Sequence, residues 1–291
     1  MSSAAFIARN LSGRRQGHNW RCPCPCGCGY SLSLADGENG LLLHCFGSCG
    51  FDEILAALVP YGLLDDDDAA LMHCEERATR ARSAGRDAYR IEHARHIYAE
   101  TGAGSLVATY IYEARGISLL PPAVLREHLQ CPHRLGIRLP AMVAPVVDVG
   151  GELTGIHATY LKRDGGGKAD LGHPEYQRET RGRIKGGATR LAEHDPDREL
   201  LVGEGLESTL SAMEIYDLPG WAALSADNLK NGLELPAAVH RIVIAADNDT
   251  AGRRAALEAH RRWTAGGHRA VRIVMPPRAG TDFNDLLTAR G

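Results

Sequence analysis

Two short apolar segments that end on acidic residues constrain the fold of this chain more than any other feature. Residues 199–203 form one run, which ends on Glu204, and residues 241–246 form a second, which ends on Asp247 and Asp249. A helical pattern follows each run. Near-continuous apolar strands that alternate with helices are typical of a parallel sheet covered on both faces. The sequence therefore predicts an α/β fold.

The three acidic residues at these strand ends are candidate metal ligands. Ligands bind beyond the carboxyl ends of parallel strands, which is where Glu204, Asp247 and Asp249 fall. Clustered carboxylates repel one another unless a cation lies between them, and their hard oxygens suit Mg²⁺ or Mn²⁺. Alternatively, Asp249, and less readily Glu204, caps the helix that follows it. Three acids at two strand ends favour the metal site.

The acidic segments of this sequence resemble those of the Toprim domain, which occurs in primases, type IA and type II topoisomerases and related nucleases. The motifs that carry the resemblance are Glu204-Gly205, Asp247-x-Asp249-x-Ala251-Gly252 and Gly280-Thr-Asp282-Phe-Asn-Asp285. They lie within residues 200–287. The resemblance implies a catalytic Mg²⁺ or Mn²⁺ site in which Asp247, Asp249 and Asp282 hold metal. It also implies that Glu204 holds a second ion or helps to deprotonate a 3′-hydroxyl.

Two positions depart from the pattern of the cellular enzymes. Those enzymes have a second acid four residues after the first glutamate, where this chain has Ser208, and Glu207 lies one residue short of it. Their last motif has two acids separated by one residue, whereas Asp282 and Asp285 here have Asn284 between them. Fewer obvious metal ligands therefore remain.

A cluster of cysteines near the N-terminus predicts a structural zinc site. Six of the eight cysteines lie between residues 22 and 49, and two β-rich segments, 30–34 and 41–45, separate them into two groups. Thiolates on either side of a hairpin are typical of a zinc ribbon, in which the metal supplies folding energy that a small segment lacks. The module resembles the N-terminal zinc-binding domain of bacterial and phage primases.

The spacing of the cysteines limits the possible ligands of this single zinc ion. Cys45 and Cys49 form the second pair. For the first pair, Cys22, Cys24, Cys26 and Cys28 offer several combinations. We favour Cys24 and Cys28, because their spacing matches the second pair, with Cys26 as the substitute. His44 is an alternative ligand.

The segment between the cysteine cluster and the acidic motifs divides into helical and β-rich parts. Residues 51–64 read as an amphipathic helix that ends near Gly62, and residues 65–68 form a solvated acidic linker. Residues 69–99 form an arginine-rich helical pattern that we interpret as a solvated helix face. Pro121 and Pro122 favour a further helix through Leu129. Residues 138–148 and 152–161 then predict a hairpin of two strands.

The stretch after this hairpin is basic. Residues 162–190 carry eight lysines or arginines against four acids, just before the acidic strand ends. A phosphate backbone or a triphosphate bound there needs this countercharge, although a solubilising loop is the alternative. The stretch resembles the basic subdomain that precedes Toprim in bacterial-type primases. That resemblance implies that Lys168 and Lys185 contact template or nucleotide, supported by Arg181 and Arg183.

The order of the segments predicts four parts in an α/β protein. They are a zinc-ribbon domain at 1–64, a charged linker and helix at 65–99, an α+β primase-like basic subdomain at 100–194, and a Toprim domain with a parallel sheet flanked by helices at 195–291. The leading interpretation is a DNA primase-type nucleotidyltransferase that makes primers on single-stranded DNA from nucleoside triphosphates. It resembles small Toprim proteins of phages, plasmids and mobile elements. The alternatives are a Toprim nuclease and a non-catalytic DNA-binding accessory protein.

Composition and missing motifs limit where the protein acts and with what. The net charge of −3 does not by itself indicate nucleic-acid binding, so any basic surface must be local. There is no signal-like or membrane-spanning apolar run, which predicts a cytoplasmic protein without a membrane partner. No Gly-x₄-Gly-Lys-[Ser/Thr] motif occurs. Unwinding would therefore require a separate helicase.

Overall fold

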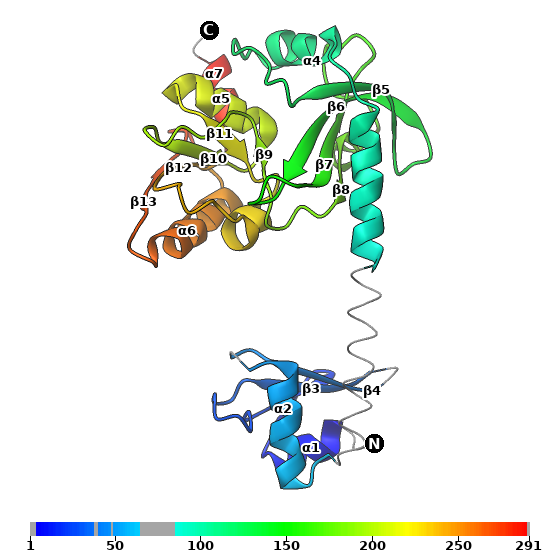
Figure 1. Cartoon of the computed structure of the whole chain (residues 1–291), viewed down its shortest axis with the longest axis vertical. Coiled ribbons are helices and arrows are strands. Elements are labelled where there is room, and N and C mark those ends of the chain that lie inside the picture. The colour runs from blue at the N-terminus through cyan, green and yellow to red at the C-terminus, as the bar shows by residue number, and fades with distance from the viewer. Residues whose placement is uncertain (1–3, 38–39, 48, 65–84, 290–291) are drawn as a thin grey trace. The chain divides into compact units, whose positions relative to one another are not determined.

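The structure, a computed structural model, describes residues 4–37, 40–47, 49–64 and 85–289 (Figure 1). The chain divides into two compact units, Met1–Arg86 and Asp87–Gly291. The acidic linker predicted at 65–68 lies outside the described residues, as does the first half of the arginine-rich pattern. Residues 85–99 of that pattern are helical. The finer domain boundaries at 64, 99 and 194 stay predictions.

The N-terminal unit is a small antiparallel sheet packed against short helices. The four strands lie in the order β1 (Arg14–Gln16), β2 (Asn19–Cys22), β3 (Leu32–Gly37) and β4 (Gly40–Cys45). The predicted hairpin is confirmed, because β3 and β4 pair with Leu32 opposite Cys45. Helix α1 (Ala4–Asn10) and helix α2 (Phe51–Leu58) contribute the other apolar residues of the core.

The end of α2 follows the sequence pattern. A 3₁₀ turn, η1 (Val59–Tyr61), continues it, and Gly62 then adopts a left-handed conformation with φ of 62°. Glycine populates this region without a Cβ clash, so the helix stops there. The helix predicted to end near Gly62 is therefore confirmed.

Four cysteine sulfurs meet where the hairpin ends. The Sγ atoms of Cys24, Cys28, Cys45 and Cys49 all lie within 4.8 Å of one another, and Cys28 Sγ is 3.2 Å from both Cys45 Sγ and Cys49 Sγ. Four sulfurs around one tetrahedral zinc ion are about 3.8 Å apart, given a Zn–S bond of about 2.3 Å. The donor set therefore fits one structural zinc ion.

The other candidate ligands lie outside this cluster. Cys26 is exposed and its thiol contacts the Glu53 carbonyl at 3.5 Å, while Cys22 is buried in strand β2. His44 is exposed and its ring packs edge-on against Phe46. The structure thus selects one of the combinations that spacing alone left open.

The C-terminal unit contains two sheets. The first is antiparallel, in the order β5-β6-β7-β8. Its strands are β5 (Arg126–Pro132), β6 (Arg138–Val147), β7 (Leu153–Tyr160) and β8 (Arg178–Gly182). Pairing of β6 with β7 confirms the predicted hairpin. Three short helical segments border this sheet: α4 (Ser105–Thr109), η2 (Tyr110–Ala114) and η3 (Pro174–Gln177).

The helix predicted from Pro121 to Leu129 is wrong. Residues 126–132 form strand β5 instead, which pairs antiparallel with β6. His128 and Cys131 are buried on this strand, and a register shift between them interrupts the pairing. Tertiary pairing with a long buried neighbour overrides the weak local helix signal here.

The second sheet has five strands in the order β13-β12-β10-β11-β9. The strands are β9 (Thr189–Arg190), β10 (Leu200–Gly203), β11 (Gly220–Ala222), β12 (Arg241–Ala245) and β13 (Ala270–Val274). All neighbours are parallel except β9, which is antiparallel to β11. The predicted parallel α/β sheet is therefore confirmed.

Helices cover both faces of this sheet (Figure 1). Helices α5 (Leu206–Tyr216) and α7 (Phe283–Thr288) pack together on one face, while α6 (Thr250–Thr264) and η4 (Asn228–Gly232) pack together on the other. The core beneath α5 also includes Met142 and Ala144 of β6, so the two sheets of this unit share one apolar core. No helix among the described residues is long and apolar enough to cross a membrane.

Replacement of the cluster cysteines tests the zinc assignment. We expect Cys45→Ser or Cys49→Ser to lose the metal and unfold the N-terminal unit, because that unit has a small core and the metal contributes folding energy. Elemental analysis and thermal unfolding measure both effects. Cys26→Ser is the matched control and should keep one zinc per chain. Zinc loss in the control, or purified wild type without zinc, would contradict the assignment.

A glycine in strand β7 tests the close approach of β8. A Cβ added to Gly155 would lie 2.7 Å from the Arg181 carbonyl oxygen and 3.0 Å from that of Arg183. Gly155→Ala should therefore destabilise the C-terminal unit by about 1–3 kcal/mol, as overpacking does. Gly102→Ala, where a Cβ meets no atom within 4 Å, is the control. Equal urea midpoints for both variants would refute the argument.

Candidate functional site

Adjacent parallel strands bring the first two acidic motifs together. Glu204 follows β10 directly, and Asp247 comes two residues after β12 ends. The register pairs Gly203 with Ala245, so the chain leaves both strands at the same edge of the sheet. Asp282 joins them at the start of α7, which packs beside α5.

The carboxylates at this edge repel one another. Burial, and then the Asp247 and Asp249 carboxylates, raise the pKa of Glu204. Burial also raises the pKa of Asp247; a hydrogen bond from Ser208 opposes this, and Asp282, Asp249 and Asp285 raise the pKa further. A bound cation relieves such repulsion, because it favours the charged form of each acid. The acids predicted from sequence are therefore electrostatic neighbours in the fold.

Two of these acids also cap helices. Asp249 Oδ1 accepts a hydrogen bond of 2.7 Å from the Gly252 amide at the start of α6. Asp282 and Asp285 form a reciprocal capping box at α7, in which the Asp285 amide donates to Asp282 Oδ1 at 2.8 Å. Capping, the alternative for Asp249, is thus present. It occupies one oxygen of each carboxylate, and the second oxygen can still face a cation.

The donor set suits a hard divalent cation with retained water. Among the described residues, the four cysteines are the one group of three or more metal-binding side chains with ligand atoms that close together. The acids at the sheet edge are more widely spaced. Mg²⁺ commonly uses one or two carboxylates and completes its shell with water and substrate phosphates. The acidic edge therefore fits an open Mg²⁺ or Mn²⁺ site that keeps bound water, and not a site in which the protein supplies every ligand.

The two departures from the Toprim pattern have structural roles. The Ser208 hydroxyl donates to Asp247 Oδ1 at 2.9 Å and accepts from the Phe283 amide at 3.4 Å, so it links the second acidic motif to the third. The Asn284 side chain is buried and donates to the Arg115 carbonyl at 2.7 Å and to Ser211 Oγ at 3.0 Å. Neither residue adds a metal ligand, but their hydrogen bonds fix the segments next to Asp247 and Asp282.

Lys168 is bound by a buried carboxylate of the Toprim segment. Its Nζ lies 2.8 Å from Glu207 Oε1, and the Tyr110 hydroxyl donates to the same oxygen at 2.7 Å. The side chains of Lys168 and Glu207 are 16% and 6% exposed. Burial opposes ionisation of Glu207, but the Lys168 ammonium outweighs it and holds the pKa of Glu207 below its usual range. Lys168 therefore carries its charge in a salt bridge between segments.

Arg178 is a functional candidate that the sequence reasoning missed. It lies on β8 opposite Thr159 of β7 and is exposed. Its guanidinium makes no hydrogen bond or ion pair with the described residues, and its charge lowers the pKa of both Glu204 and Glu207. Because Arg178 and Thr159 are paired directly across the two strands, their side chains share one face of the sheet. The basic excess in residues 162–190, which includes Arg178, was the signal that could have indicated it.

Two buried side chains of β7 lie on this face. Burial lowers the pKa of His157 to about 4, so it is neutral at neutral pH. His157 Nδ1 and Thr159 Oγ1 are buried without a hydrogen-bond partner. Such atoms are usually satisfied by water or by a ligand. The face of the sheet that carries Arg178 therefore has polar groups as well as positive charge.

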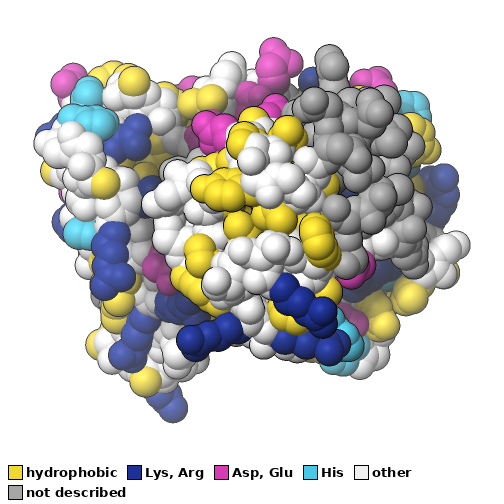
Figure 2. Space-filling view, turned by 90° about the horizontal axis from the view of Figure 1, so that it is seen from below, with side chains coloured by type: hydrophobic (Ala, Val, Ile, Leu, Met, Phe, Trp, Pro, Cys, Tyr) yellow, Lys and Arg dark blue, Asp and Glu magenta, His cyan; other side chains and the backbone are white. Residues whose placement is uncertain are grey.

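The remaining basic candidates are spread over different places. Arg181 Nη2 is bound to Glu179 at 2.8 Å and to the Pro132 carbonyl at 2.9 Å, so it serves the middle sheet. Arg183 is exposed, and its Nη2 lies 3.5 Å from Asp148 Oδ2. Lys185 is also exposed, in a loop that Asn228 holds through hydrogen bonds to Gly186 and Gly187. Basic side chains (dark blue) lie among hydrophobic and neutral ones on the face in Figure 2. The structure does not gather the four predicted residues at one point.

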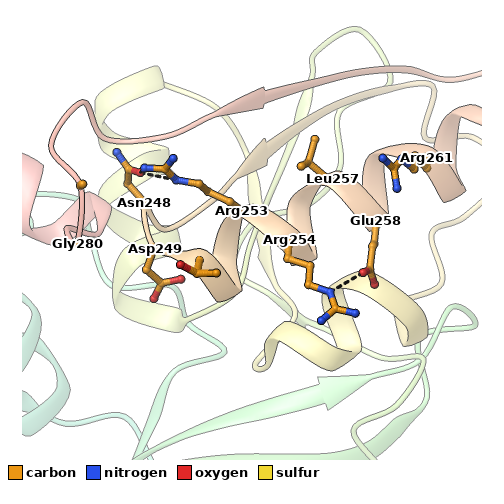
Figure 3. Close-up of a pocket in the computed structure, with 10 residues that line it drawn as sticks. Asn248, Asp249, Arg253, Arg254, Leu257, Glu258, Arg261 and Gly280 are labelled. Atoms are coloured by element: carbon orange, nitrogen blue, oxygen red, sulfur yellow. Dashed lines mark hydrogen bonds and ion pairs between the residues drawn. The ribbon is translucent and has the colours of Figure 1, made fainter.

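A groove beside the acidic edge runs along α6 (Figure 3). Its volume is 710 Å³. Asn248, Asp249 and Gly280 lie at one end, and Arg253, Arg254, Leu257, Glu258 and Arg261 lie along the helix. Asp249 thus belongs both to the acidic edge and to the groove.

Two segments of the chain match domain families. Residues 88–191 match a domain of unknown function, DUF7146, and residues 199–291 match the Toprim domain. No curated protein matches the chain.

Several solved structures are similar to it at low identity. The primase fragment of the bacteriophage T7 primase-helicase protein is 20% identical, with 52% of this chain and 59% of that chain covered and a TM-score of 0.38. The DnaG primase catalytic domain bound to ssDNA is 21% identical, with coverage of 52% and 49% and a TM-score of 0.37. The Aquifex aeolicus primase fragment with zinc-binding and RNA polymerase domains is 16% identical, with coverage of 99% and 83% and a TM-score of 0.43.

This chain spans 59% and 49% of the first two of these structures. The family match in the C-terminal third agrees with the acidic motifs, the parallel strands that carry them and the helices on both faces. Residues 199–291 therefore form a Toprim domain.

Proposed function

We propose that this chain is a DNA primase-type nucleotidyltransferase, which synthesises short primers on single-stranded DNA in the replication of a phage, plasmid or other mobile element. One observation carries the proposal: the half-buried, mutually repelling carboxylates Glu204 and Asp247 meet at the carboxyl ends of two parallel strands in a Toprim domain. The cysteine cluster supports it, because a zinc module before a basic segment and Toprim resembles the order in primases.

The acidic residues would have different roles in phosphoryl transfer. Asp247, Asp249 and Asp282 would hold the divalent cations, which neutralise charge on a triphosphate and its transition state when bound. Glu204 has a raised pKa, so it accepts a proton from the attacking 3′-hydroxyl more readily than an ordinary carboxylate, or it ligates a second ion. Ser208 holds Asp247 in position through their hydrogen bond.

The basic residues would supply countercharge for phosphates. Arg178 is exposed and unpaired among the described residues, its charge lowers the pKa of Glu204, and Lys185 is exposed in the loop after β8. Both suit contact with template or nucleoside triphosphate. Lys168 acts through its salt bridge with Glu207, which holds the middle segment against α5. Strand opening would come from a separate helicase.

Replacement of the acids tests this function. Asp247→Asn and Glu204→Gln should each reduce primer synthesis about a hundredfold, because a lost metal contact costs about 3 kcal/mol of transition-state stabilisation. Without divalent metal the variants should melt at or above the wild-type temperature, since a repelling charge is gone. The rise in melting temperature on adding Mg²⁺ should disappear. Labelled products on single-stranded DNA and melting curves provide both measurements.

The control for these variants is Asp170→Asn, an exposed acid of the middle segment that should keep wild-type activity. Variants that melt lower and still make primers at the wild-type rate would show that the acids are structural. Cut template instead of new primers would identify a Toprim nuclease. If the protein binds DNA but neither makes primers nor cuts the template, it is an accessory protein.

The Lys168–Glu207 pair gives a separate prediction. Lys168→Met leaves Glu207 buried without its ammonium partner and should destabilise the C-terminal unit by about 3–5 kcal/mol. The double variant Lys168→Met with Glu207→Gln should recover most of this loss, because glutamine is neutral and still accepts from Tyr110. Urea unfolding measures the difference.

Lys185→Ala is the contrasting variant. It should leave stability unchanged, weaken single-strand binding and reduce its dependence on salt, because Lys185 is exposed. If Lys168→Met is as stable as wild type, the salt bridge is not structural. If Lys185→Ala binds single-stranded DNA as tightly as wild type, the loop that carries Lys185 only increases solubility.

A further inference from the structure

A row of cationic side chains on α6 has no assigned role in the proposed reaction. Arg253, Arg254 and Arg261 line the groove in Figure 3, and Leu257 lies among them. Residues 253, 257 and 261 are four apart, so they share one face of the helix. Arg253 and Arg261 are about 12 Å apart along the axis. The groove therefore has positive charge along its length and begins at Asp249, next to the acidic edge.

Arg253 and Arg261 have no carboxylate partner among the described residues, so their charge is available, whereas Arg254 is paired. Arg253 is held by the side chain of buried Asn248, whose Nδ2 donates to the Pro276 carbonyl at 2.7 Å. The Asn248 amide oxygen is neutral, so Arg253 is positioned without being neutralised. The Arg261 guanidinium is exposed and makes no hydrogen bond or ion pair with a described residue. Arg254 pairs with Glu258 at 2.8 Å, and its side chain is 74% exposed.

A fourth cation extends the row toward the basic loop. Lys230 lies on η4, which packs against α6, and its Nζ is 3.4 Å from Asp227 Oδ1. Its charge, with those of Arg254 and Arg261, lowers the pKa of Glu258. Gly232 ends η4, and a Cβ added there would lie 3.2 Å from Lys185 Cγ. Lys230, Arg253, Arg254 and Arg261 are called the α6 band below. Lys185 borders it on one side, and the acidic edge borders it at Asp249.

We propose that the α6 band binds the sugar-phosphate backbone of a single strand of nucleic acid that extends away from the acidic edge. This inference rests on the proposed function, because it gives the strand a route past the site. Proteins that bind a single strand use a positively charged groove that follows its backbone. Leu257 is 52% exposed within the groove and offers apolar surface there. Several guanidiniums in a row suit successive phosphates better than one isolated anion.

The test is binding of a labelled single-stranded oligonucleotide to the full chain, without added divalent metal or nucleotides. Arg254→Ala with Arg261→Ala should weaken binding about tenfold. The slope of log affinity against log salt should fall by about 1.4, since each lost phosphate contact on a single strand contributes about 0.7. Arg86→Ala with Arg90→Ala is the matched control, because it removes the same charge from an exposed helix outside the groove.

The outcomes separate this inference from the proposed function. Unchanged affinity and slope in the α6 variant, or equal losses in the control, would overturn the inference even if the protein makes primers. Weakened binding in the α6 variant alone would support it even if the protein makes none. Competition with inorganic tripolyphosphate gives a further arm. If the α6 substitutions weaken tripolyphosphate binding and leave oligonucleotide binding unchanged, the band holds a free triphosphate and not a strand.

Discussion

The buried ion pair between Lys168 and Glu207 is the interaction on which the arrangement of the site depends. Lys168 lies between β7 and β8 of the middle sheet, and Glu207 lies in the first turn of α5, three residues after Glu204. A charge removed from water is costly unless it keeps its partner, so this pair resists separation. It joins the segment between β7 and β8 to the start of α5, directly after β10. The hydroxyl of Tyr110 adds a third segment to the same contact.

The acidic edge shows that capping and metal binding are compatible roles. Asp249 and Asp282 each use one oxygen to begin a helix, which fixes the direction of the carboxylate. Burial and mutual repulsion raise the pKa of Glu204 and Asp247. The fold therefore keeps charges together at a cost to its own stability, which is common where a site must bind a cation. Ser208 offsets part of this cost through its hydrogen bond to Asp247.

Local pattern was a good guide where one segment carried its own signal. The apolar runs before Glu204 and Asp247, the hairpin between β6 and β7, and the glycine that ends α2 and η1 could all be predicted. The family match confirms the Toprim prediction. The segment 121–129 could not be predicted, because pairing with β6 decides it and local propensity is weak by comparison. The strands β1 and β2 likewise carry little pattern of their own.

The sequence by itself determined which residue types carry the chemistry: cysteines at matched spacing, and acids at the ends of parallel strands. Only the tertiary structure decided which partners they have. Ser208 meets Asp247 across 39 residues of sequence, and Tyr110 meets Glu207 across 97. The same long-range packing placed the charge of Arg178 where it lowers the pKa of Glu204 and put Arg181 into the middle sheet. Residue order specifies strands and turns through local sterics, whereas a side chain's partner depends on how whole elements pack.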